Sequence, residues 1–428
     1  MKTTFTIFAI VFIFLAGCAH PVPSFLPPEQ VIDRKNNAAA LTKPYVILIS
    51  IDGFRPDYMK RFGAIHLQRL AREGAEAEAL VPVYPSKTVP NHYSIITGLY
   101  PEDHGIVANE FYDPDLKAMY RLFDRDAVEN SVWYTGEPLW VTAEKQGVLT
   151  ASFFWLGSEA PIGGTYPTYR IRPYDGKVAS QARTAKVIEW LSLPADRRPH
   201  FITVYFPEVD SMSHSFGTFS DQSAIAAREI DRTIADLADW IRGQDLPVYL
   251  VIVSDHGMDD VEKTSFVALD DLADLSDFQV VGAGPQSYLY SKSGNRKTIA
   301  ATYRKLASQA SKNQFQVFLR EDLPARYHLK KSKRAGDLMV LADHPNHVGI
   351  REVWERVPLL GHHGWDPEKT PTMNATFILW GPQVKPGFRL GKVSALDVRP
   401  WISQILGLTE IKGLPSKGGS IPTALQAP

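Results

Sequence analysis

The stretch Y-V-I-L-I-S-I-D-G, residues 45–53, decides the fold of this 428-residue chain. Its first seven residues are apolar except for Ser50, and such a run is typical of a strand that a sheet buries on both faces. Strands of this kind belong to parallel α/β sheets, whose ligands bind beyond the carboxyl ends of the strands. Asp52 follows the run directly. The stretch therefore predicts a parallel sheet with a polar site that begins at Asp52.

Similar apolar runs, separated by helical patterns, recur along the chain. Residues 177–193 and 223–242 predict helices, and the second has isoleucines and a leucine at helical spacing. The alternation of strand and helix favours an α/β fold with a doubly wound, largely parallel central sheet flanked by helices. Further strands are expected at residues 151–155, 201–206, 248–253 and 376–380.

Residues 262–358 interrupt this alternation. Short strands at 287–290, 314–319 and 337–342 surround one helix at 296–311. We interpret the segment as an α+β lobe inserted into a catalytic domain that spans residues 44–428.

The first 17 residues predict an export signal, since one lysine precedes an apolar segment too short for a comfortable membrane span. The segment ends in L-A-G-C, residues 15–18, which resembles the bacterial lipoprotein cleavage box. Lipid is therefore expected on Cys18, with residues 18–43 as a tether rich in proline and polar residues. Ala19 favours the periplasmic side of the outer membrane. Cys18 is the only cysteine, so stability is expected to come from the core rather than from disulfides.

The charge balance excludes some partners. The formal net charge is −1 and no basic block occurs, so a nucleic-acid polymer is not expected as an obligate partner. No feature of the sequence indicates a protein partner.

The run Y-P-S-K-T-V-P-N-H-Y-S-I-I-T-G-L-Y-P, residues 84–101, contains the predicted nucleophile, Thr88. Pro90 stands where the start of a helix tolerates proline. Thr88 is therefore expected at a helix N-terminus, where free N–H groups attract phosphate oxygens.

Aspartates and histidines near the predicted strand ends form a candidate metal site. Two of them, Asp210 and His214, are four residues apart, so one helical turn places them on the same side. Carboxylate oxygen and imidazole nitrogen bind zinc and related ions, and catalytic sites leave positions open. His362 is an alternative to its neighbour in the last motif. The candidate ligands are Asp52, Asp210, His214, Asp255, His256 and His363.

Six motifs, in order and over nearly the whole mature chain, resemble those of the nucleotide pyrophosphatase/phosphodiesterase family, within the alkaline phosphatase superfamily. The run at 84–101 looks like the family's nucleophile motif. The other five are S-I-D-G-F-R-P-D-Y (50–58), H-G-I-V-A-N-E-F-Y-D (104–113), D-S-M-S-H-S-F-G (210–217), S-D-H-G-M (254–258) and G-H-H-G-W-D (361–366). The resemblance implies an alkaline phosphatase-like fold.

The resemblance also implies two zinc ions and a phospho-threonine on Thr88. A metal would lower the pKa of the threonine hydroxyl, and two divalent ions would clamp an in-line displacement. Asn109 would bind a phosphoryl oxygen through its amide. One zinc would be held by Asp52, Asp255 and His256 and bridged to Thr88, and the other by Asp210, His214 and His363.

Other polar residues in these motifs have simpler interpretations. His92 and His104 are expected to be structural or to lie just outside the ligands, and Lys87 is expected to be a solvated charge. These residues carry no predicted role in the reaction.

The substrate is predicted to be a nucleotide phosphodiester or pyrophosphate. Nucleotide-cleaving members of the family commonly place a phenylalanine after the threonine, where it stacks on the base, and this chain has Val89 there. Tyr174 is expected to supply the opposite face of a base slot. Val89 and Tyr174 are thus predicted to contact the substrate. A phospholipid or choline phosphodiester remains the alternative.

Other functional classes fit the sequence less well. A sulfatase requires a C/S-x-P-x-R context, and neither Cys18 nor Ser86 has one. A phosphomonoesterase usually holds its dianion with an arginine, and none lies close to Thr88 in sequence. A non-catalytic envelope lipoprotein would predict an incomplete ligand set, and here every position is filled.

Overall fold

The computed structural model of the chain describes residues 26–262, 264–356 and 359–426. The predicted export signal and Cys18 lie outside the described residues. Among the helices of the described residues, none is long and apolar enough to cross a membrane.

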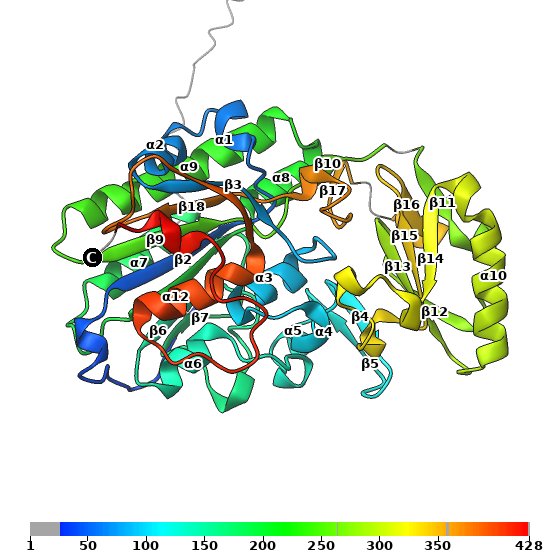
Figure 1. Ribbon diagram of the computed structural model, residues 1–428, viewed down its shortest axis with the longest axis horizontal. Coiled ribbons are helices and arrows are strands. Elements are labelled where there is room, and N and C mark those ends of the chain that lie inside the picture. Colours follow the sequence, from blue (N-terminus) through cyan, green and yellow to red (C-terminus); the bar gives the residue numbers. More distant parts are fainter. Residues whose placement is uncertain (1–25, 263, 357–358, 427–428) are drawn as a thin grey trace, which may run out of the picture.

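A nine-stranded sheet forms the centre of the main domain (Figure 1). Its five strands from β7 to β9 pair in parallel, as the apolar runs predict. The strand expected at residues 376–380 is present, but β18 runs antiparallel to both of its neighbours, so the sheet is mixed. In sheet order the strands are β1 (Glu29–Val31), β7 (Tyr169–Ile171), β6 (Thr150–Phe153), β8 (Phe201–Phe206), β2 (Tyr45–Ile51), β9 (Val248–Val253), β18 (Phe377–Trp380), β3 (Ala75–Val81) and β19 (Phe388–Ser394).

Strand β2 shows why its run is apolar on both faces. Val46 and Leu48 pack in a core that contains residues of helices α3 (Thr88–Thr97) and α12 (Val398–Leu406). Ile47 and Ile49 pack in a second core, with helices α2 (Ile65–Glu73), α7 (Ser180–Leu191) and α9 (Asp221–Arg242). Helices therefore cover both faces of the sheet, and the doubly wound fold is confirmed.

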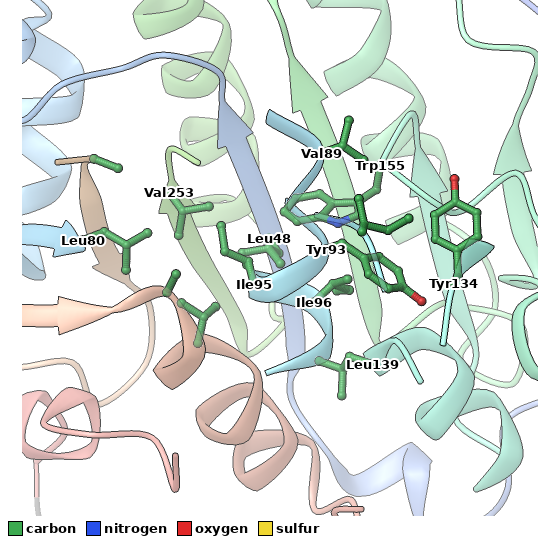
Figure 2. Packing of buried hydrophobic residues seen from close by; sticks show 14 of the residues in the cluster. Leu48, Leu80, Val89, Tyr93, Ile95, Ile96, Tyr134, Leu139, Trp155 and Val253 are labelled. Atoms are coloured by element: carbon green, nitrogen blue, oxygen red, sulfur yellow. The ribbon is translucent and has the colours of Figure 1, made fainter. Parts of the chain in front are cut away.

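Helix α3 is buried along its whole length. Ile95 and Ile96 lie in one core with Leu48 of β2 and Val253 of β9, and Figure 2 shows them together. On the other side, the Tyr93 hydroxyl donates to the carbonyl oxygen of Gly136 at 2.6 Å. Packing around the helix thus fixes the position of its first residue, Thr88.

The inserted segment forms a lobe at one end of the molecule (Figure 1). The strands and the helix expected there are present, and they have a core of their own. Two short strands, β10 (Asp259–Asp260) and β17 (Gly361–His362), pair where the lobe joins the main domain. The lobe contains a sheet of β12 (Phe278–Val281), β13 (Gln286–Ser291), β15 (Leu338–Ala342) and β14 (Phe315–Leu319), the pair β11 (Phe266–Ala268) and β16 (His347–Gly349), and helices α10 (Arg296–Asn313) and α11 (Arg351–Glu355).

Short elements complete the main domain. A hairpin of β4 (Glu110–Asp113) and β5 (Ala118–Arg121) comes after helices α3 and α4 along the chain. The remaining α-helices are α1 (Tyr58–Arg61), α4 (Pro101–His104), α5 (Arg125–Val128), α6 (Leu139–Lys145) and α8 (Glu208–Phe216).

The predicted tether needs correction. Of residues 18–43, those from 26 onward pack on the domain, and β1 adds an antiparallel edge strand to the central sheet. The buried amide of Asn36 donates to the carbonyl oxygens of Ala195 and Arg198 and accepts from the Leu149 N–H. Proline and polar residues suggested a tether, but they satisfy backbone groups of the domain instead.

We expect Asn36→Ala to lower the free energy of unfolding by about 2–4 kcal/mol, because it leaves buried backbone partners unsatisfied. The neighbouring change Lys35→Ala should have little effect, since the Lys35–Asp196 ion pair is solvent-exposed. Urea unfolding of the two variants measures the difference. A tether would give no difference between them.

Candidate active site

Three adjacent strands bring most of the predicted ligands to one edge of the sheet. Asp52 directly follows β2, and Asp255 and His256 come two and three residues after the end of β9. Helix α8 begins two residues after β8 and carries Asp210 and His214. Because β8, β2 and β9 are neighbours in parallel, these side chains meet beyond their carboxyl ends.

The first cluster surrounds the Nε2 atom of His256. This atom lies 3.0 Å from Asp255 Oδ2 and 3.4 Å from Asp52 Oδ1. The Thr88 hydroxyl lies 3.2 Å from the same nitrogen. Asp52, Asp255 and His256 each offer an atom within 4.8 Å of the others, a spacing that suits one metal ion.

The second cluster surrounds Oδ1 of Asp210. The Nε2 atoms of His214 and His363 lie 3.3 Å and 3.8 Å from it. The rings of His363 and His256 stack with centroids 3.6 Å apart, so His256 lies between the two clusters. The β10–β17 pair delivers His363 to this place, because His363 directly follows β17.

Backbone carbonyls orient the three histidines. In each histidine the Nδ1–H group donates to a carbonyl oxygen. His214 donates to Gly361 at 2.7 Å, His256 to Gly257 at 2.8 Å and His363 to Ser86 at 2.9 Å. A carbonyl oxygen can only accept, so these bonds place the proton on Nδ1 of each neutral ring. The Nε2 lone pairs therefore face the carboxylates, as metal-binding histidines require.

The other histidines of the motifs have their own hydrogen-bond partners, although His92 Nδ1 also lies 3.4 Å from Asp255 Oδ2. His92 donates from Nδ1 to the Thr88 carbonyl oxygen and accepts at Nε2 from the Ser50 hydroxyl. His104 accepts at Nδ1 from the Ile106 N–H and donates from Nε2 to the Ser94 hydroxyl. The His362 ring lies against Gly284 of the lobe. These contacts agree with a structural role for His92 and His104 and with the choice of His363 over its neighbour.

Buried negative charge defines the electrostatics of the site. One carboxylate oxygen each of Asp52, Asp210 and Asp255 is buried without a hydrogen-bond partner among the described residues. Burial and repulsion from the other carboxylates raise the pKa of Asp52 well above its usual value and that of Asp255 to about 8. Burial also disfavours the charge of Asp210, but His214 and His256 outweigh it and lower the pKa of Asp210. Unpaired oxygens that face imidazole nitrogens fit a divalent cation of the zinc type.

Two polar contacts prepare the surroundings of Thr88. The Val89 N–H donates to Asn109 Oδ1 at 2.9 Å, which leaves the Asn109 NH₂ group to face the adjoining cavity. The Tyr205 hydroxyl donates to Asp52 Oδ2 at 2.5 Å and holds that carboxylate in place. The strand pattern predicted the position of Tyr205 but not this role.

A cavity of about 470 Å³ opens beside Thr88 and the two clusters. Tyr174, which is predicted to contact the substrate, lines this cavity and packs edge-on against Phe154. Val89 does not line it: its side chain is fully buried beside Trp155, so its predicted contact with the substrate is wrong (Figure 2). The residue after Thr88 points into the core because α3 packs there on all sides.

Part of the cavity wall escaped prediction. Phe123 follows the β4–β5 hairpin, and its side chain is 84% exposed at the wall. Arg125 donates to Glu159 at 2.9 Å, and Glu159 accepts from the Tyr174 N–H. Glu159 ends the sequence F-W-L-G-S-E at residues 154–159, which is the local signal that could have indicated this wall.

Two carboxylate–imidazole clusters beyond the strand ends of a mixed α/β sheet are typical of metal-dependent hydrolases. Comparisons of the chain with known proteins show which family of this class it belongs to. The family model described as type I phosphodiesterase / nucleotide pyrophosphatase matches residues 46–366. The chain is 34% identical to human ectonucleotide pyrophosphatase/phosphodiesterase family member 1 over 391 residues, 89% of this chain and 42% of that protein. It is 32% identical to the venom phosphodiesterase of Macrovipera lebetinus over 394 residues, 90% of this chain and 45% of that protein.

Solved structures agree with these similarities. Murine ectonucleotide pyrophosphatase/phosphodiesterase 5 superimposes with a TM-score of 0.82 at 26% identity, over 89% of this chain and all of that one. An inactive threonine-to-alanine variant of the same mouse protein, in complex with AMP, also gives a TM-score of 0.82. The chain therefore belongs to the type I phosphodiesterase/nucleotide pyrophosphatase family. It spans less than half the length of the curated relatives named above.

We expect the metal-free protein to lose thermal stability between pH 6.5 and 8. Asp255 is protonated in the folded state up to a pKa of about 8, whereas its ordinary pKa is 3.8, so unfolding releases a proton in this range. Stability then falls with rising pH, by at most about 1.4 kcal/mol per pH unit for one group. The pKa values of His256 and His363 are lowered, so these two groups make stability rise with pH. They do so only below pH 6.5, the ordinary pKa of histidine.

Thermal unfolding with a chelator, across this pH range, measures the effect. Zinc should reduce or reverse the fall because protons and metal compete for the same carboxylate. Asp255→Asn should also reduce it. A metal-free melting temperature that rises from pH 6.5 to 8 would contradict this account of the site.

Proposed function

We propose that the protein is a zinc-dependent phosphodiesterase that hydrolyses nucleotide phosphodiesters and pyrophosphates through Thr88. The observation that carries the proposal is the Thr88 hydroxyl, which begins a buried helix and lies 3.2 Å from His256 between carboxylates with unpaired oxygens. The names of the relatives support the reaction class. The inactive threonine variant bound to AMP supports a threonine nucleophile and a nucleotide substrate.

The residues of the chain divide the work of the first displacement. Thr88 Oγ1 forms a bond to phosphorus as the bond from phosphorus to the leaving oxygen breaks. The Asn109 NH₂ group, whose oxygen is held by the Val89 N–H, binds a phosphoryl oxygen. The second displacement exchanges the bond to Thr88 for one to water, so the configuration at phosphorus is retained overall.

Two zinc ions are the proposed cofactors. When bound, they would lower the pKa of the threonine hydroxyl and offset the phosphoryl charge. Carbonyl-oriented imidazoles and carboxylates without any thiolate suit zinc. The proposed ligands are Asp52, Asp255 and His256 for one ion, and Asp210, His214 and His363 for the other.

The wide part of the cavity is proposed to hold the nucleoside. Tyr174 and Phe154 offer aromatic surface, and the Arg125–Glu159 pair offers polar groups. Leu122 and the exposed Phe123 give one wall an apolar surface, which favours the second candidate, a phospholipid or choline phosphodiester. Rates of hydrolysis of four substrates separate the candidates: a nucleoside monophosphate ester, a phosphorylcholine ester, a simple diester and a monoester. A preference for the phosphorylcholine ester would overturn the nucleotide proposal.

Thr88→Ala is expected to lower kcat by at least about 1,000-fold, because it removes the nucleophile. Zinc content should stay close to two ions per chain, since the six other ligands remain. Thr88→Ser keeps a hydroxyl and should retain measurable activity. Metal analysis and turnover of the nitrophenyl ester of AMP test both predictions. An alanine variant with more than a few per cent of wild-type turnover would exclude Thr88 as the nucleophile.

We also propose that the protein is anchored through lipid on Cys18, on the periplasmic side of a bacterial outer membrane. The support is the L-A-G-C sequence at residues 15–18 and Ala19 behind it. Two or more acyl chains give stable attachment, whereas one gives only marginal binding. Cys18→Ser should abolish palmitate labelling of the chain in cells, and labelling that persists would require another anchor.

A further inference from the structure

The second cluster is assembled from two elements that are far apart in the sequence. Asp210 and His214 stand on α8, whereas His363 directly follows β17, where the chain returns from the lobe. The first cluster differs, because its ligands follow strands β2 and β9 of the central sheet. The geometry of the second cluster therefore depends on how α8 is held against β17.

The chain at β17 holds His214 at two points. The Leu360 N–H donates to the His214 carbonyl oxygen at 2.8 Å, and the Gly361 carbonyl oxygen accepts from the ring Nδ1–H at 2.7 Å. This close approach requires glycine at position 361, because a Cβ there would lie 2.5 Å from the Ser213 carbonyl oxygen. The last turn of α8 and strand β17 thus form one packed unit.

Asp260 ties the end of α8 to the other strand of the neck, by which we mean the β10–β17 pair. Asp260 lies opposite Gly361 in that pair. Its Oδ1 atom accepts from both the N–H and the hydroxyl of Thr218, each at 2.7 Å. Thr218 is fully buried and comes two residues after the last residue of α8. Without this acceptor, two buried donors would be left unsatisfied where the chain leaves the helix that carries the ligands.

We propose that Asp260 is a positioning residue for the second metal site, and that it fixes α8 relative to His363. The inference rests on the proposed zinc-dependent function and deepens it. Asp260 is exposed and does not line the catalytic cavity, so it acts through α8 and not on the substrate. Loss of a contact that orients metal ligands typically lowers metal affinity by about 10- to 100-fold.

The first metal site should be spared. Asp255 and His256 lie on the same connection as Asp260, but this connection is held by the main domain before the neck begins. The Gly257 N–H donates to the Met373 carbonyl oxygen at 2.8 Å. A change at Asp260 is therefore expected to weaken only the second cluster.

Zinc titration of the full chain against a chelator of known affinity measures the two sites. Asp260→Ala should raise the Kd of one zinc ion by about tenfold or more and leave the other close to its wild-type value. Asp260→Asn keeps an acceptor oxygen and should restore binding. Asp236→Ala removes an exposed acid of α9 and is the matched control for the change in net charge, so it should leave both sites unchanged.

A second variant identifies the weakened ion. His363→Ala removes a ligand of the second cluster and should lose the same ion. In that background, Asp260→Ala should have no further effect on the zinc that remains. A further loss of the remaining zinc in the double variant would place the effect of Asp260 on the first cluster and contradict the proposal.

Turnover of the nitrophenyl ester of AMP at varied zinc concentration separates positioning from other roles. In Asp260→Ala, the zinc concentration for half-maximal kcat should rise, whereas kcat at saturating zinc should approach the wild-type value, because all the ligands are present. A catalytic role would lower kcat at every zinc concentration. A structural role alone would lower the melting temperature without a selective change in zinc binding.

Thr218→Val tests the same contact from the other side and serves if Asp260→Ala does not fold. Valine keeps the shape of threonine but lacks the hydroxyl that donates to Asp260. It should therefore weaken the same zinc ion to a smaller extent. Unchanged zinc binding in the variants that fold, or equal weakening of both ions, would overturn the role of Asp260. A wild type that binds no zinc would instead refute the proposed function, and this inference with it.

Discussion

Repulsion among three buried carboxylates is the constraint on which the rest of this structure depends. Asp52 and Asp255 are buried beside the half-buried Asp210, and each of the three has a buried oxygen that no described donor satisfies. Burying unpaired charge is costly, and a protein normally avoids it by protonation, pairing or metal binding. Here the carboxylates come from the ends of adjacent strands and from the helix that follows one of them, so the sheet holds them close. The fold thus maintains a metal site that is unfavourable for the protein alone.

Two further features place the remaining groups against this charge. The proposed nucleophile, Thr88, stands on a helix that is buried on all sides, so that its position follows from packing rather than from a loop. His363 comes from beyond the lobe, and the short β10–β17 pair returns the chain beside His256. Both devices fix the geometry with apolar packing and backbone bonds, which do not depend on pH.

The parts of this arrangement that local sequence determines could be predicted. Strands β2, β8 and β9 are unbroken apolar runs, and the acids and histidines near their ends could only meet at one edge. Strand β3 reads A-E-A-E-A-L-V and β19 lies at the sheet edge, so neither contains an unbroken apolar run that predicts a buried strand. The direction of β18 depends on its neighbours in the sheet, which its own sequence does not determine. Val89 was assigned to the substrate, but the core beside Trp155 surrounds it. The role of Tyr205 arises from its contact with Asp52, a residue distant in sequence, and no local pattern contains that information.

The paired strands at the neck have a consequence for how such a protein can diversify. Because β10 and β17 bond to each other, the two ends of the lobe are held in place by the main domain and not by the lobe's interior. Replacement of the lobe sequence between them would leave His256 and His363 where they are. The lobe is in this sense an exchangeable module: its interior can change without moving the histidines at its two ends.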